Sequence, residues 1–166
     1  MLNGRIPAPP VLQAAAAARR PALDLVIDTN VVLDWLVFRN PVGAPLEDAL
    51  TSRQCRWLCT RPMREELAHV IARASLARWA IDADAVLAVY DALGVDVGTP
   101  PLPGAADRLH CSDPDDQPFV DLAIARRVHA LLTRDRALLR LARRARRFGV
   151  LIATPEVWLR QPRVAS

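Results

Sequence analysis

The chain has 166 residues, of which 52% are hydrophobic, and a formal net charge of +4 at pH 7. This length and composition favour one α/β domain with its own core and exclude a disordered chain. All 22 basic residues are arginine, which excludes a P-loop and disfavours a receiver domain, since both depend on a lysine. No apolar run is long enough to span a bilayer, and the three cysteines lack zinc-ligand spacing. We therefore expect a protein of the reducing cytoplasm with no membrane partner.

The domain organisation predicted from the sequence is simple. Residues 1–22 are rich in alanine and proline and lack the basic start and leucine-rich core of a signal peptide, so we expect a disordered or loosely ordered extension. A single domain is predicted over 23–160, followed by a short tail over 161–166.

Within this domain, strand-like and helix-like stretches alternate, which is typical of βαβ units and predicts an α/β fold with a parallel sheet. Strands are predicted over 23–27, 56–59, 130–132 and 150–153. Helices are predicted over 31–38, 46–51, 63–73, 83–93 and 136–147, and one more begins after 113–118 and ends near 127. The proline- and glycine-rich stretch 95–105 is predicted to be a surface loop.

Polar residues follow two of these strands directly. Asp28, Thr29 and Asn30 end the first apolar run, and Thr133 and Asp135 follow the strand at 130–132. Because the carboxyl ends of parallel strands emerge at one edge of a sheet, the two aspartates should meet there despite their separation in sequence. Asp28 could serve as the N-cap of the next helix, or Asn30 could cap that helix instead and leave Asp28 free for the site. The Thr133 hydroxyl is the candidate donor beside them.

Helical periodicity selects a third acid in the helix at 63–73. Glu66 lies at the border of its apolar stripe, where a carboxylate can reach a site, whereas Glu65 lies on the opposite, solvated side. The stripe consists of Met63, Leu67, Val70, Ile71 and Ala74.

A fourth acid comes from the segment before the helix that ends near 127. Asp113, Asp115 and Asp116 all favour the positive end of a helix dipole, and Asp116 is preferred as a ligand because it lies closest to the helix start. Which of the three serves remains open. Asp121, one turn further on, is predicted to face solvent.

Three or four carboxylates without histidine or thiol form a hard, oxygen-rich site that suits Mg²⁺ or Mn²⁺. With such an ion the site could activate water for attack on a phosphodiester. Nearby arginines suit a phosphate backbone, although a merely solvated helix face is the alternative. The candidates are Arg134 and the row Arg136, Arg140, Arg143 and Arg147, opposite a stripe of Leu138, Leu141, Ala142 and Ala145.

Taken in order, these motifs resemble the PIN-domain nucleases, and in particular the toxin components of toxin–antitoxin systems. The motifs are Asp28-Thr29-Asn30, Glu66-Leu67, Asp113-Pro-Asp-Asp116 with Pro118-Phe119, and Thr133-Arg-Asp135. The resemblance covers roughly residues 23–160.

The resemblance implies a three-layer α/β/α sandwich and an endoribonuclease dependent on Mg²⁺ or Mn²⁺. It places Asp28, Glu66, Asp116 and Asp135 in the acidic quartet, with Asn30 and Thr133 orienting it. It also implies an RNA substrate, a small antitoxin that blocks the site, and self-association into a homodimer.

Three other functions could use the same kind of acidic residues or the same fold. A haloacid-type phosphatase would need an aspartate where Asn30 stands, and a flap nuclease would need arches or hairpins for which the chain has no room. A catalytically silent domain that binds RNA or a protein is the remaining alternative.

Overall fold

The computed structural model describes residues 22–73, 81–101, 104 and 108–161. Nearly all of the expected N-terminal extension and C-terminal tail, and Ala74 of the predicted stripe, lie outside these residues. Within the described ranges no helix has both the length and the apolar character needed to cross a membrane.

The centre of the fold is a five-stranded sheet in the order β3-β2-β1-β4-β5, and all neighbouring strands are parallel. All five carboxyl ends therefore emerge at one edge. The strands are β1 (Leu23–Ile27), β2 (Cys55–Cys59), β3 (Gly94–Asp96), β4 (Ala130–Leu132) and β5 (Leu151–Ala153).

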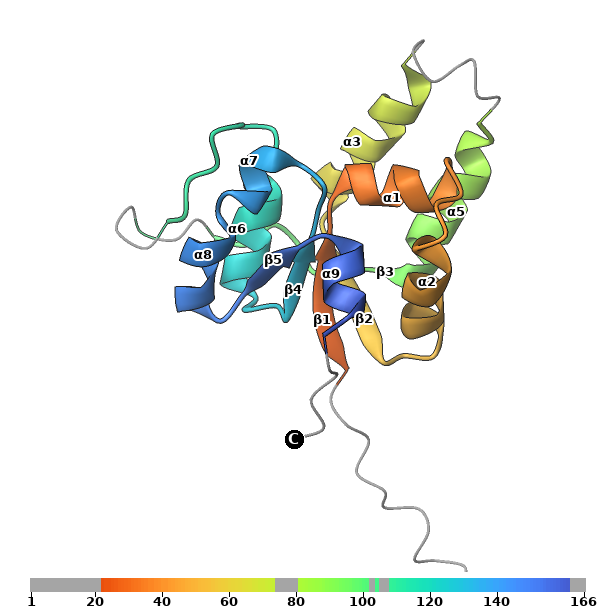
Figure 1. The fold of residues 1–166 in the computed structure, drawn as a ribbon. Helices are drawn as coiled ribbons and strands as arrows, with labels where there is room; N and C mark the ends of the chain where they lie inside the picture. The colour runs from red at the N-terminus through yellow and green to blue at the C-terminus, as the bar shows by residue number, and fades with distance from the viewer. Residues whose placement is uncertain (1–21, 74–80, 102–103, 105–107, 162–166) are drawn as a thin grey trace, which may run out of the picture.

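Helices lie on both sides of this sheet, which confirms the predicted three-layer α/β/α arrangement. Figure 1 shows α1, α2, α3 and α5 on one side and α6, α7 and α8 on the other. The helices are α1 (Thr29–Leu36), α2 (Gly43–Thr51), α3 (Arg61–Ala72), α5 (Ala83–Leu93), α6 (Gln117–Ala125), α7 (Arg136–Leu139), α8 (Ala142–Ala145), the 3₁₀ helix η3 (Arg146–Phe148) and α9 (Pro155–Leu159).

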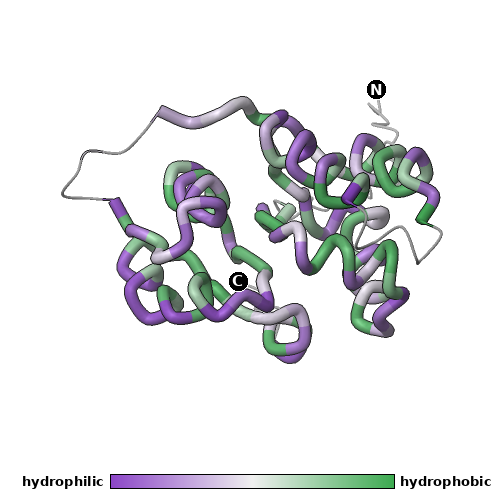
Figure 2. Tube along the Cα trace, turned by 90° about the horizontal axis from the view of Figure 1, so that it is seen from above, coloured by the Kyte–Doolittle hydropathy of each residue, from purple (hydrophilic) through white to green (hydrophobic). Residues whose placement is uncertain are grey.

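The central strand β1 and its neighbour β4 are buried along most of their length. Leu25, Val26 and Ile27 are at most 3% exposed, as expected for a parallel strand covered on both faces. Figure 2 shows, from above, that hydrophobic and hydrophilic residues alternate along the helices. Ile27 pairs with Leu132, and the polar residues after each strand therefore begin at the same level.

The structure corrects two predicted elements. Residues 94–96, most of which were expected in a loop, form the edge strand β3, which is too short to show an alternating pattern. The helix expected over 136–147 is divided into α7, α8 and η3. Leu138, Leu141 and Ala145 of the predicted stripe are buried, but the predicted arginine row does not lie along one continuous helix. The terminal helix α9 was not predicted.

Candidate active site

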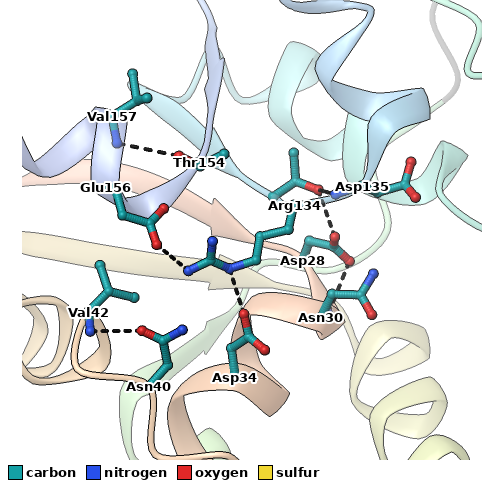
Figure 3. Close-up of polar contacts among 11 residues, drawn as sticks. Asp28, Asn30, Asp34, Asn40, Val42, Arg134, Asp135, Thr154, Glu156 and Val157 are labelled. Carbon is teal, nitrogen blue, oxygen red and sulfur yellow. Dashed lines mark hydrogen bonds and ion pairs between the residues drawn. The ribbon is translucent and has the colours of Figure 1, made fainter.

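A hydrogen-bonded link joins the carboxyl ends of β1 and β4. The Thr133 hydroxyl donates to Asp28 Oδ2 at 2.7 Å, and its oxygen accepts the backbone N–H of Asp135 at 2.9 Å. Asp28 and Thr133 are 1% and 0% exposed, so this link forms the floor of the site. Figure 3 shows Asp28, Asn30 and Asp135 grouped at the strand ends.

Of the two candidate caps, Asp28 and not Asn30 caps α1. Asp28 precedes the first helical residue in an extended conformation, and its Oδ1 accepts the backbone N–H of Asn30 at 3.4 Å. Asn30 lies inside the helix, where its side chain is exposed. Burial raises the pKa of Asp28, the Thr133 hydrogen bond lowers it, and the charge of Asp135 raises it further.

Asp135 has the corresponding position at the start of α7. Its Oδ1 accepts the backbone N–H groups of Ala137 at 2.5 Å and Leu138 at 3.2 Å. No group of the described residues donates a hydrogen bond to Oδ2 in the same carboxylate. Both strand-end aspartates thus use one oxygen to begin a helix, and Asp135 keeps the other available.

On α3 the two neighbouring glutamates differ as the periodicity predicted. Glu65 is exposed and pairs with Arg61 at 2.8 Å, whereas Glu66 is half-buried. Burial raises the pKa of Glu66, and the charges of Asp28 and Asp115 raise it further. Glu66 therefore lies within the electrostatic field of Asp28.

Asp116 is the aspartate of its segment that interacts most strongly with the strand ends. It is half-buried at the N-cap position of α6, but its side chain makes no capping hydrogen bond. Burial, and then the charges of Asp28, Asp135, Asp113 and Glu66, raise the pKa of Asp116 to about 7. By contrast, Asp113 and Asp115 are exposed, and Asp113 Oδ1 accepts the backbone N–H of Asp115 at 3.0 Å.

The prediction that Asp121 faces solvent is wrong. Asp121 is 7% exposed, and its carboxylate accepts hydrogen bonds from Arg108 at 2.7 Å and Gln117 at 2.7 Å. The segment at 108–111 covers the outer face of α6, so both faces of this helix are buried. The periodicity of one helix contains no information about such a cover.

Arg134 has two acidic partners of its own. Its Nε lies 2.5 Å from Asp34 Oδ2 on α1, and its Nη2 pairs with Glu156 on α9, as Figure 3 shows. We therefore place Arg134 among the residues that hold the edge together rather than among contacts to a substrate. Sequence reasoning missed Asp34 and Glu156. Asp34 offered a signal, because an acid between Leu33 and Trp35 in an apolar helix needs a partner.

The remaining candidate arginines, Arg136, Arg140 and Arg143, are exposed on α7 and α8 and at the link between them. Arg140 Nε donates to the Arg136 carbonyl at 3.1 Å. No carboxylate of the described part of the chain pairs with these three side chains, so their charge is available to an anionic ligand next to Asp135.

The donor set of this edge consists of carboxylate oxygens, which hard divalent cations prefer. Repulsion between the acids contributes to the raised pKa values of Asp28, Glu66 and Asp116, and a cation would relieve it. Within the described residues no three Asp, Glu, His or Cys side chains are grouped closely enough to hold an ion by themselves. The residues therefore fit Mg²⁺ or Mn²⁺ bound through few carboxylates and several waters, and do not fit a closed zinc site.

Comparison with known protein families adds an independent finding. The profile described as PIN domain matches residues 24–137, which is more than half of the chain and includes the four acids. Neither the curated proteins nor the solved structures contain a match to this chain.

Proposed function

The chain belongs to the PIN-domain family, whose members are generally metal-dependent nucleases, and we propose that it is an endoribonuclease dependent on Mg²⁺ or Mn²⁺. The observation that carries the proposal is the Thr133 hydroxyl, which bonds both to Asp28 and to the backbone of Asp135. Asp116 lies within the electrostatic field of both aspartates. Buried groups thus hold like-charged acids close together, which costs stability and is typical of functional sites.

In this proposal Asp28, Glu66, Asp116 and Asp135 surround the cation, which a few of them would bind directly and the others through water. When bound, the cation supplies the positive charge that activates water and stabilises charge on the phosphate. Thr133 fixes the orientation of Asp28. One carboxylate oxygen of Asp28 accepts from the Thr133 hydroxyl and the other from the backbone N–H of Asn30, so the side chain cannot rotate away.

RNA contacts are proposed for Arg136, Arg140 and Arg143, whose charges are not neutralised by the described residues. Each phosphate contact on a single strand contributes about 0.7 to the slope of log affinity against log salt. Replacing all three by glutamine should therefore lower the slope by about 2. Arg53→Gln is the control, because Arg53 is exposed before β2 at the opposite edge of the sheet. An unchanged slope in the triple variant would exclude these contacts.

We further propose that the protein acts as the toxin of a toxin–antitoxin pair, with a small antitoxin as partner and a homodimer as its own assembly. The resemblance to toxin components supports this role. Expression of the wild type should arrest growth of a bacterial host, whereas Asp28→Asn should not. Light scattering of the purified protein tests the homodimer.

The proposed activity is tested by cleavage of a mixed RNA pool in Mg²⁺, Mn²⁺ or EDTA. We expect the wild type to cut only with a metal, and Asp28→Asn to lose at least a thousandfold of the rate while remaining folded. Asp48→Asn is the matched control, because Asp48 is exposed on α2. A folded wild type that cuts none of the pool with either metal would favour the RNA- or protein-binding alternative.

A further inference from the structure

A second feature of the carboxyl edge is a groove of about 590 Å³ beside the acids. It lies between the start of α3 and the segments that precede α6. Its lining includes Thr60, Pro62, Pro100, His110, Pro114 and Pro118.

The groove shares its walls with the elements that carry the acids. Pro62 lies one helical turn before Glu66 on α3, and Pro114 and Pro118 lie on either side of Asp116. In the sheet, β2 and β3 are on one side of β1, while β4, which leads into the arginine-bearing α7, is on the other. The acids therefore lie between the groove and the exposed arginines.

Hydrogen bonds make the groove wall a fixed structure. Gln117 donates to the Leu109 carbonyl at 3.0 Å and accepts the Cys111 N–H at 2.8 Å. It also donates to Asp121, which pairs with Arg108. Because Arg108 already has a carboxylate partner, the groove offers little free positive charge, and a phosphate would be a poor occupant.

Thr60 and His110 in the groove have no such partners. Thr60 is 4% exposed, and its hydroxyl makes no hydrogen bond with the described residues. His110 is exposed in the same lining. The Thr60 hydroxyl oxygen is not one of the fully buried unpaired polar atoms of the described residues, so a ligand with a polar edge in the groove could bond to it. Apolar walls with a few fixed polar groups are typical of sites for small organic groups.

We propose that this groove receives an unpaired base of the RNA substrate, close to the phosphate that is cut. The inference rests on the proposed function, because the RNA backbone must pass from the exposed arginines across the acids to reach the groove. The proline rings would contact the face of the base, and Thr60 and His110 would bond to its edge. An unpaired, unstacked base is the form of RNA that proteins can read in this way.

The test compares binding of a fluorescent 12-nucleotide RNA with binding of the same chain without bases, both in EDTA. We expect the wild type to bind the complete RNA at least tenfold more tightly. The double variant Thr60→Val with His110→Ala should reduce this ratio to less than threefold. Arg140→Gln should weaken both affinities equally and keep the ratio. His129→Ala is the control, because His129 is exposed before β4, at the edge of the sheet opposite the site.

A wild-type ratio near one, or a ratio unchanged in the double variant, would overturn the inference. If the double variant does not fold, His110→Ala alone decides, since this exposed side chain makes no hydrogen bond with the described residues. The cleavage assay separates this inference from the proposed function. If the wild type cuts RNA but binds it no more tightly than the chain without bases, the base site is wrong and the activity stands. If it binds the complete RNA more tightly but does not cut it, the activity is wrong and the base site stands.

Discussion

Replacing Asp116 by asparagine should stabilise the metal-free protein at alkaline pH. Below pH 3.8, the ordinary pKa of an aspartate, this carboxyl is protonated in both folded and unfolded chains. As pH rises to about 7, the unfolded chain loses the proton while the folded chain keeps it. The wild type therefore loses stability across this interval, and above it the loss is complete. Asparagine cannot ionise, so the variant avoids the loss.

The size of the effect follows from the pKa difference. A rise from 3.8 to about 7 corresponds to about 4 kcal/mol at about 1.4 kcal/mol for each pH unit. Asp116 is only half-buried, and solvent screens charges at such a position. We therefore expect Asp116→Asn to gain about 1–2 kcal/mol at pH 8.5 and less than about 0.5 kcal/mol at pH 4.

Urea unfolding in EDTA at the two pH values measures this difference directly. Asp48→Asn is the control, since an exposed substitution on α2 should change stability by less than about 0.5 kcal/mol at either pH. Addition of Mg²⁺ at pH 8.5 should stabilise the wild type more than the variant, because the cation neutralises the acids. An equal gain at both pH values, or no gain at pH 8.5, would refute the electrostatic explanation.

Three further results are expected. Thr133→Val removes the hydroxyl that bonds to Asp28. It should lower the free energy of unfolding by about 1–3 kcal/mol and abolish most of the cleavage rate. A free energy of thermal unfolding within about 0.5 kcal/mol of the wild type would contradict this role. Arg134→Met leaves the carboxylates of Asp34 and Glu156 without their partner and should cost about 1–2 kcal/mol in urea unfolding. Arg134→Lys should restore only part of this stability, because lysine lacks the planar fork that bonds to both carboxylates. Gly149→Ala should cost about 1 kcal/mol in the same assay, since Gly149 has a φ of 77°; an unchanged midpoint would show that the turn adapts.

The strand ends of the site could be predicted from the sequence because a buried apolar run defines its own limits. The strands predicted over 23–27 and 130–132 have the bounds found in the structure. The position of the polar residues after each strand follows from those bounds, and their meeting follows from the common edge of a parallel sheet.

Features that depend on distant contacts could not be predicted in this way. Asp121 is buried because a segment at 108–111 covers it, and Arg134 is engaged because α1 and α9 each place an acid beside it. Neither contact leaves a periodic pattern in the sequence. The helix expected over 136–147 has such a pattern, yet it is divided into α7, α8 and η3, and the pattern does not show where the breaks fall.

The division between rigid strand ends and the segments around them also indicates how substitutions should act. Thr133 bonds to Asp28, which lies 105 positions away in the sequence, so the arrangement of the acids depends on the sheet, which tolerates little movement. The groove walls come instead from segments outside the sheet, such as the one containing His110, where binding residues commonly vary. Changes at the strand ends should therefore lower kcat, whereas changes at Thr60 and His110 should raise KM and alter the preferred base. If both kinds of change lowered only kcat, the groove would be part of the catalytic centre rather than a separate site for the base.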